Sequence, residues 1–326
     1  MNILITGGAG FLGRRLADAL LARGVLTGPG GAPEAISRLT LLDITSGPPI
    51  HDPRIRTVVG DISDERLSNE LVDGGTACIF HLAAIVSAMV EAEFDLGMRI
   101  NVDATRLLLE ACRQAGHRPR VVFASSVAVF GGRLPDTVHD DTAVNPQSSY
   151  GTQKAIGELL CNDYTRKGFI DGRVLRLPTI SVRPGRPNAA ASSFASGIVR
   201  EPLNGEASVC PVEPGTRIWV MSPATALACF VRGHELPADA LADSRTVNLP
   251  GISVTAGEMV TSLARVAGPE VAQRVRWELD PRIARIVASW PGAWDTTRAR
   301  ALGFPADESF DEIIRSYMAE AAVRRT

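Results

Sequence analysis

The chain has 326 residues, of which 45% are hydrophobic and 21% charged, and its formal net charge is −2. This length and apolar content predict a large globular core, in one unit or in two closely joined ones. The balanced charge argues against a nucleic-acid partner and a basic membrane-binding patch, and the longest apolar run, residues 78–90, is too short to cross a bilayer.

The cysteines and histidines bear on compartment and metal binding. Five cysteines occur without a Cys-x-x-Cys pair, and five histidines without a His-x-x-x-His pair. Isolated thiols fit a reducing compartment, and this spacing predicts no metal site. Met1 leads directly into a strand-like segment, which predicts no secretory leader. We therefore expect a cytoplasmic protein without a metal ion.

The first half of the chain alternates short aliphatic runs with longer helical patterns. Strands are expected at 2–6, 38–43, 54–61, 77–83, 120–125 and 173–178. Helices with a 3.6-residue apolar period are expected at 11–24, 64–74, 91–115 and 150–167. Because the strands are apolar almost throughout, helices should cover both faces of their sheet. The pattern predicts an α/β fold, a doubly wound parallel sheet of the Rossmann type.

After Pro178 the composition shifts toward Gly, Pro, Ser and Ala, and the periodicity weakens. Further helices are expected at 222–235, 254–268 and 309–322. This shift predicts two domains. They are an NAD-binding Rossmann domain over 1–177, to which 217–249 returns, and a smaller substrate-binding domain made of 178–216 and 250–326.

The segment TGGAGFLG, residues 6–13, places three spaced glycines between the first strand and the first helix. Gly7 permits a tight turn, Gly10 lets the backbone approach a pyrophosphate, and Gly13 lets the helix lie against the sheet. The free N–H groups at the start of a helix also favour a phosphate. The spacing predicts a dinucleotide site, and an ordinary glycine-rich turn is the alternative.

The second strand ends in Asp43, which indicates the kind of dinucleotide. A carboxylate at this place accepts hydrogen bonds from the ribose hydroxyls and repels a 2′-phosphate, so it favours NAD over NADP. Asp43 lies 30 residues beyond Gly13, where about 20 is usual. We interpret residues 27–37, rich in Gly and Pro, as a surface loop that accounts for the difference.

Two later strand ends are also expected at the cofactor. Asp61 and Ile62 follow the third strand and would hold the adenine edge. Asp61 is equally suited to cap the helix that comes next, and both roles can hold together. Three residues after the fourth strand would lie against the ribose, namely Leu82, Ala83 and Ala84.

Tyr150 and Lys154 stand four residues apart in a predicted helix, in a chain that has only three tyrosines and two lysines. They therefore share one helix face. An ammonium beside the phenol would lower the phenol's pKa from about 10 and make it a general base near neutral pH. Ser125 and Ser126 end the fifth strand, where a hydroxyl can orient a substrate oxygen or simply satisfy local backbone groups.

The motifs TGGAGFLG at 6–13, DI at 61–62, LAA at 82–84, SSVAVFGG at 125–132 and YGTQK at 150–154 resemble the extended short-chain dehydrogenase/reductase family, and residues 295–314 resemble its C-terminal end. The resemblance implies a catalytic triad of Ser126, Tyr150 and Lys154 acting on one hydroxyl or carbonyl. It also implies that Asn101 supports the active site from the long helix. By the same match we expect further cofactor contacts from Phe11, Leu12, Asn101 and Pro178, and substrate contacts from Ser87, Ser126, Tyr150 and Arg183.

The segment after the sixth strand bears on the substrate. Arg183 and Arg186 are fixed cations suited to a two-pronged grip on a carboxylate, with the short polar Asn188, Ser192 and Ser193 nearby. A small hydroxylated acid fits this set better than a bulky diphosphate sugar. Two arginines can equally clamp a diphosphate, and surface arginines often contact nothing.

Within the family, the segments SSVAVFGG, YGTQKAIGELL and VRPGRPNAAASSFASGI most resemble enzymes that oxidise the C2 hydroxyl of a four-carbon sugar acid with NAD. The resemblance also implies a homodimer, made by pairing the helices at 91–115 and 150–167 into a four-helix bundle. Two alternatives remain. One is a nucleotide-sugar 4-epimerase with tightly bound NAD, and the other is a non-catalytic NAD-sensing protein.

Overall fold

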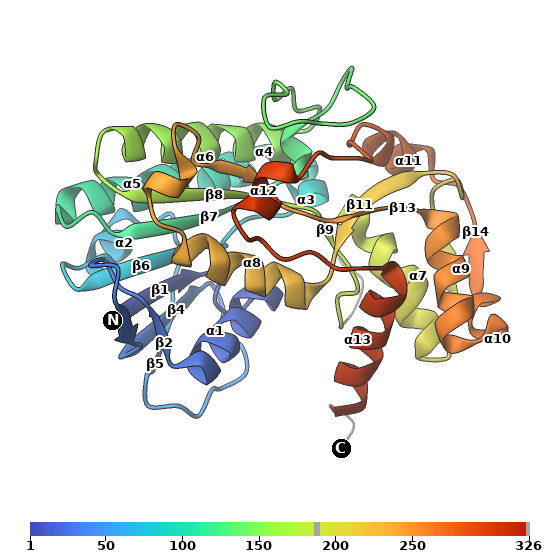
Figure 1. Cartoon of the computed structure of the whole chain (residues 1–326), viewed down its shortest axis with the longest axis horizontal. Coiled ribbons are helices and arrows are strands. Elements are labelled where there is room, and N and C mark those ends of the chain that lie inside the picture. The colour runs from blue at the N-terminus through green and yellow to red at the C-terminus, as the bar shows by residue number, and fades with distance from the viewer. Residues whose placement is uncertain (186–189, 324–326) are drawn as a thin grey trace.

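The computed structural model describes residues 1–185 and 190–323. Its centre is a seven-stranded parallel sheet in the order β12-β8-β7-β6-β1-β4-β5 (Figure 1). The strands are β1 (Asn2–Thr6), β4 (Arg38–Asp43), β5 (Ile55–Val59), β6 (Thr76–His81), β7 (Arg120–Ser126), β8 (Asp171–Leu177) and β12 (Thr246–Asn248). The predicted doubly wound parallel sheet is confirmed.

Each strand buries alternate residues on opposite faces of the sheet, as a side-chain period of two requires. In β1, Ile3 and Ile5 belong to one apolar cluster and Leu4 to another. The helices on the first face are α1 (Phe11–Arg23) and α8 (Pro223–Glu235), and those on the second are α2 (Glu65–Leu71), α5 (Ala104–Ala115) and α6 (Ser149–Arg166). Strands covered on both sides explain the continuous apolar runs in the sequence.

The single helix expected over 91–115 is divided. A break at Glu93 separates α3 (Ser87–Ala92) from α4 (Phe94–Gly97), and a π-helical segment, Met98–Asp103, leads into α5. Only within α5 do the apolar residues of the expected helix lie on one buried face. A π segment widens the helix locally and turns its side chains in a new direction, so a 3.6-residue pattern does not predict it.

The expected surface loop over 27–37 is instead a short antiparallel hairpin of β2 (Val25–Thr27) and β3 (Pro33–Ala35). Its turn is closed by the Gly28 N–H, which donates to the carbonyl of Ala32 at 2.8 Å. The Thr27 hydroxyl donates to Glu235 at the end of α8, so the hairpin is fixed to the body of the protein. The insertion lies where expected. It is not a loop, because β2–β3 pairing and the hydrogen bond from Thr27 to Glu235 fix its conformation.

Beyond β8 the chain builds a second, smaller layer at the right of Figure 1. Its three-stranded sheet has the order β13-β11-β9, while α8 and β12 return to the main sheet. The predicted domain boundaries stay a prediction. The remaining elements are β9 (Thr179–Ile180), β10 (Ser208–Cys210), β11 (Arg217–Met221), β13 (Ile252–Thr255), β14 (Val275–Trp277), α7 (Phe194–Leu203), α9 (Ala256–Ala267), α10 (Pro269–Ala272), α11 (Pro281–Ala288), α12 (Thr297–Ala301) and α13 (Phe310–Val323).

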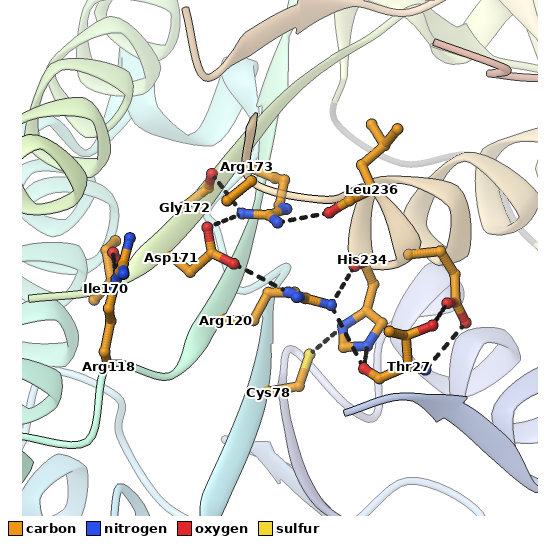
Figure 2. A network of polar contacts seen from close by, with 12 residues as sticks. Thr27, Cys78, Arg118, Arg120, Ile170, Asp171, Gly172, Arg173, His234 and Leu236 are labelled. Atoms are coloured by element: carbon orange, nitrogen blue, oxygen red, sulfur yellow. Dashed lines mark hydrogen bonds and ion pairs between the residues drawn. The ribbon is translucent and has the colours of Figure 1, made fainter. Parts of the chain in front are cut away.

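A buried polar network lies at the amino ends of β7 and β8 and reaches across to α8 and the hairpin (Figure 2). Asp171 accepts hydrogen bonds from Arg173 and, at 3.2 Å, from Arg120, and Arg245 lies 3.6 Å away. Arg173 is fully buried, and its guanidinium also donates to the carbonyl of Leu236 at 2.7 Å. The Asp171 carboxylate is therefore the counter-charge of three arginines. It lies at the amino ends of the strands, on the opposite edge of the sheet from their carboxyl ends.

Among the described residues, no helix is long and apolar enough to cross a bilayer. In the same part of the chain, no three histidine, cysteine, aspartate or glutamate side chains come together as metal ligands would.

Candidate active site

A cavity of about 600 Å³ opens at the carboxyl ends of the main-sheet strands, which lies within the usual size of cofactor sites, about 300–1,000 Å³. Its walls come from both layers of the protein. The sequence-predicted residues that line it are Gly7, Gly10, Phe11, Leu12, Gly13, Asp43, Asp61, Ile62, Leu82, Ala83, Ala84, Ser87, Ser126, Tyr150, Lys154, Pro178 and Arg183. Segments far apart in the chain therefore meet at one site.

The three glycines of the first turn have different surroundings. A Cβ on Gly7 would lie 2.9 Å from the backbone nitrogen of Ala83, and Gly7 has a positive φ of 71°. A Cβ on Gly13 would lie 2.1 Å from the carbonyl oxygen of Gly7. A Cβ on Gly10 would meet only that carbonyl, at 3.1 Å, and Gly10 precedes α1 without a side-chain cap. The protein's own packing requires Gly7 and Gly13, whereas Gly10 leaves the N–H groups of α1 open to a phosphate.

We expect Gly10→Ala and Gly13→Ala to differ. The Gly10 variant should keep its thermal midpoint and lose NAD affinity at least tenfold, because its methyl group occupies the approach to the helix start. The Gly13 variant should lower the thermal midpoint, because α1 must move away from the turn. Calorimetry and NAD titration of both variants measure this difference. Unchanged NAD affinity in Gly10→Ala would place the pyrophosphate elsewhere.

Asp43 lies at the end of β4 with both carboxylate oxygens partly engaged. One oxygen accepts the Ala9 N–H at 3.1 Å and the other the Thr45 N–H at 3.3 Å. No arginine or lysine among the described residues forms an ion pair with it. The oxygens keep lone pairs that can accept ribose hydroxyls, and the charge opposes a 2′-phosphate.

Asp61 is tied to an arginine that the sequence did not single out. Arg99, in the π-helical segment, donates to the Asp61 carboxylate at 2.5 Å and to the Ser63 hydroxyl at 2.6 Å. Burial acts to raise the pKa of Asp61, but the hydrogen bonds that it accepts from Arg99 and from the Ser63 hydroxyl and N–H, with the Arg99 charge, hold it below its usual value. Asp64, rather than Asp61, caps α2. Both Asp61 and Arg99 line the cavity, and no motif in the sequence marks Arg99.

Asn101 lies behind the cavity wall, not on it. Its side-chain oxygen accepts the Ile85 N–H at 2.8 Å, and its side-chain nitrogen donates to the Ile85 carbonyl at 3.1 Å and to Gln153 at 2.8 Å. Asn101 therefore joins the loop after β6 to α6, beside the tyrosine and lysine.

A buried histidine supports the same loop. His81 lies between the hydroxyls of Thr6 and Thr105, at 2.7 and 3.0 Å, and Thr6 also accepts the Ala83 N–H at 3.2 Å. Burial, together with the charge of Lys154, lowers the pKa of His81 to about 3. A neutral imidazole held from both sides is a structural support here.

The serine, tyrosine and lysine lie together at the end of β7. Ser148 caps α6 by accepting the Gly151 N–H at 3.1 Å, so Tyr150 lies in the first turn and Lys154 one turn later. The Ser126 hydroxyl faces the Tyr150 phenol closely enough to act to lower its pKa, and it accepts the Ala128 N–H at 3.2 Å. Both roles considered for Ser126, orientation of a reacting oxygen and local capping, are therefore compatible.

The expectation that Lys154 lowers the pKa of Tyr150 is wrong. Burial raises the pKa of Tyr150 to about 12, against the lowering effects of the Ser126 hydrogen bond and the Arg183 charge. Burial likewise lowers the pKa of Lys154 to about 8. The Lys154 ammonium donates to the Ala124 carbonyl at 2.9 Å and lies 5.8 Å from the centre of the Tyr150 ring. The sequence showed the pairing but not the desolvation, which dominates.

Arg183 lines the cavity from the segment after β9. Its backbone N–H donates to the Ser196 hydroxyl at 3.0 Å, while no carboxylate among the described residues pairs with its guanidinium. Burial and the neighbouring Arg200 lower the pKa of Arg183, and the Tyr150 phenol opposes this. A partly buried cation without a counter-charge is suited to an anionic ligand.

The rest of the proposed substrate side is only partly described. Ser192 lines the cavity, whereas Arg186 and Asn188 lie outside the described residues. Trp290, which follows α11, contributes a wall that the sequence reading missed. Trp290 is distant in the chain from the motifs of the first 183 residues that line the cavity, so none of them indicates it.

A parallel sheet with a glycine turn before α1, a carboxylate at the end of β4 and a Ser–Tyr–Lys set in one cavity define a dinucleotide-binding protein of the short-chain dehydrogenase/reductase type. The chain belongs to the NAD dependent epimerase/dehydratase family, which matches residues 3–219.

Three similar proteins cover nearly the whole chain. A D-erythronate dehydrogenase from Cupriavidus necator is 60% identical over 325 residues and covers 100% of both chains. One from Haemophilus influenzae is 48% identical, covering 98% of this chain and 99% of its own. A crystal structure described as a nucleoside-diphosphate-sugar epimerase from Agrobacterium tumefaciens has a TM-score of 0.92 and 42% identity, covering 98% of this chain and 94% of that one.

Proposed function

We propose that this protein is an NAD-dependent dehydrogenase that oxidises the C2 hydroxyl of D-erythronate to the 2-oxo acid. The observation that carries the proposal is the meeting at one cavity of the Tyr150 phenol, the Ser126 hydroxyl and the Arg183 guanidinium, which pairs with no carboxylate in the described part of the chain. Its support from relatives is the full-length similarity to two proteins named for this activity. The epimerase description belongs to a less similar protein, so the dehydrogenase is favoured.

The side chains have distinct tasks in this reaction. Arg183 binds the carboxylate and thereby places C2 beside the phenol, while Ser126 donates to the reacting oxygen. Tyr150, as phenolate, takes the hydroxyl proton as the C2–H bond releases hydride and the carbonyl forms. NAD, when bound, supplies the hydride acceptor and a positive charge on its nicotinamide ring that favours the phenolate. Residues of the turn at 7–13, with Asp43, would hold it.

A direct assay tests the function. Purified protein with D-erythronate and free NAD should produce NADH continuously, measured as absorbance at 340 nm. A 4-epimerase would give no net NADH, and an NAD-sensing protein would bind NAD without turnover. Parallel assays with other four- to six-carbon aldonates, and with NADP, define the specificity. No NADH from any aldonate would refute the proposal.

We expect Arg183→Met to raise the KM for the acid by about 10- to 100-fold, because a charge-assisted hydrogen bond to a carboxylate contributes about 1.5–3 kcal/mol. Arg183→Lys keeps the charge but loses the planar fork, so its KM should fall between the two. Initial rates over a range of acid concentration measure both, and NAD affinity serves as the control. A KM unchanged in Arg183→Met would place the carboxylate elsewhere.

A homodimer in the cytoplasm completes the proposal. The outer faces of α3, α4 and α6 expose large apolar side chains, Met89, Phe94 and Leu159, of which Leu159 is 66% exposed. Apolar surface of this kind favours pairing of the same helices from two copies. Sedimentation should show a dimer for the wild type and a monomer for Leu159→Glu; a wild-type monomer would refute it.

The cysteines bear on the compartment and not on the dimer. All five are free and buried, as a reducing compartment allows.

A further inference from the structure

The catalytic helix is joined to the catalytic strand by a series of contacts, one from each of three consecutive residues. At the end of β7, each interacts with a different residue of α6: the Ala124 carbonyl accepts from Lys154, the Ser125 hydroxyl donates to Glu158, and the Ser126 hydroxyl acts to lower the pKa of Tyr150. The first and third contacts hold residues of the proposed triad. The middle one, at 2.5 Å, involves a carboxylate for which the proposed reaction has no direct use.

Glu158 is buried and fully engaged. Besides the Ser125 hydroxyl, it accepts two parallel hydrogen bonds from Arg176 of β8, at 2.9 and 2.7 Å. Arg176 is itself fixed, because it donates to Asn248 at 3.2 Å and lies 4.6 Å from the centre of the Phe130 ring. Because Arg176 binds both oxygens of Glu158 and is itself held by Asn248 and Phe130, the Glu158 carboxylate has one fixed position.

Two glycines bring α6 close enough for these contacts. A Cβ on Gly151 would lie 2.0 Å from the Ala128 carbonyl oxygen, and one on Gly157 would lie 2.6 Å from the Phe123 ring. The helix therefore packs directly on the strand end, and a small displacement of α6 would separate Tyr150 from Ser126.

Lys154 is buried, and no carboxylate among the described residues forms an ion pair with it. Its charged form is therefore stabilised only by negative charge that lies nearby without direct contact. The titratable groups that interact with it are Tyr150, Glu158 and Cys161 of α6 and His81 of β6. Two cations act on members of this set: Arg176 of β8 pairs with Glu158, and Arg183 after β9 acts on Tyr150. Burial keeps His81 and the Cys161 thiol uncharged, lowering the pKa of the first and raising that of the second. Cys161 and, to a smaller extent, Glu158 oppose the effect of burial on the Lys154 pKa. Glu158, one helical turn after Lys154, is the carboxylate of the two.

We propose that Glu158, held by Arg176 and Ser125, is a positioning residue that fixes α6 on the end of β7 and keeps the Lys154 ammonium charged in a desolvated site. The proposal rests on the proposed function for its catalytic consequence. The state of Lys154 itself does not depend on which acid is oxidised.

Lysine-labelled protein tests the electrostatic part directly, because Lys154 and the exposed Lys167 are the only two lysines of the chain. NMR titration of their side-chain signals should give a midpoint near 8 for Lys154. In Glu158→Gln this midpoint should fall by about half a pH unit or more, while that of Lys167 stays unchanged. A Lys154 midpoint unchanged in the variant would overturn the electrostatic part of the proposal.

The kinetic consequence is read from the pH profile of turnover. In Glu158→Gln, kcat should fall at least tenfold and its alkaline limb should move to lower pH, while the KM for NAD changes little. Glu235→Gln, which removes a carboxylate bound to Arg23 and Thr27 away from the cavity, is the matched control and should leave the profile unchanged. A reduced kcat with an unshifted limb would show a packing effect only and overturn the role of the charge.

A double variant covers the case in which Glu158→Gln does not fold. Glu158→Met with Arg176→Met removes both charges at similar volume, which is often tolerated in a buried pair. Because the Arg176 cation is lost together with the Glu158 anion, the Lys154 midpoint should fall by less than in Glu158→Gln, and a midpoint that rises would overturn the electrostatic part of the proposal. If the wild type forms no NADH from any aldonate, the proposed function fails while the lysine titration still decides this proposal.

Discussion

Tyr150→Phe should lower kcat for acid oxidation by at least about 10³-fold and leave NAD binding intact. The ring fills the same space, so the cavity keeps its shape, but the variant has no group to accept the hydroxyl proton. Proton transfer by a positioned side chain contributes about 10²–10⁴-fold, and the described cavity holds no second phenol. Steady-state rates with D-erythronate and a fluorescence titration with NADH measure the two effects.

Ser126→Ala is the matched comparison for this variant. It removes the hydroxyl that acts on the phenol and would donate to the reacting oxygen, but it leaves the proton acceptor, so the expected loss of kcat is smaller, about 10- to 100-fold. Two results would contradict the mechanism. One is normal turnover by Tyr150→Phe, and the other is a larger loss in Ser126→Ala than in Tyr150→Phe.

The pKa values of the site constrain its working state. Because burial raises the pKa of Tyr150 to about 12, each unit between this value and the working pH costs about 1.4 kcal/mol in forming the phenolate. Arg183 and the nicotinamide cation are the positive charges available to reduce that cost. Activity should therefore rise with pH through the neutral range, and it should fall again where Lys154 loses its proton.

Local sequence patterns predicted many of the residues that gather at the cavity, for a physical reason. The turn at 7–13, Asp43 and the Tyr150–Lys154 pair each depend on a strand end or one helical turn, so spacing along the chain fixes their geometry. The doubly wound sheet was predictable because strands buried on both faces must be continuously apolar.

The missed features depend on contacts distant in sequence or on burial. Arg99 reaches Asp61 through a π-helical segment, and Trp290 comes from the far end of the chain. The Glu158–Arg176 pair joins α6 to β8, which no periodicity indicates. The pKa of Tyr150 follows from desolvation, and desolvation is known only when the whole fold is assembled.

The network at the amino ends of β7 and β8 should dominate stability rather than activity. Asp171→Asn removes the carboxylate that accepts from Arg173 and Arg120 (Figure 2) and lies near Arg245, and it leaves these cations without a counter-charge. Removing one member of a buried pair costs about 3–5 kcal/mol, so the free energy of unfolding at pH 7 should fall by that amount. Urea unfolding measures the loss, and kcat of the folded variant should stay within about twofold of the wild type.

The pH dependence separates this mechanism from a simple packing defect. Burial acts to raise the pKa of Asp171, but the hydrogen bond and charge of Arg173 and the charge of Arg120 hold it below its usual value. The stabilisation is therefore complete above the unfolded pKa of about 3.9 and is lost as pH falls through the lower folded value. The amide that Asp171→Asn introduces does not titrate, so the wild type should lose its advantage over the variant only below about pH 4. A difference that stays constant down to about pH 2 would show that shape at this position, not the carboxylate charge, stabilises the fold.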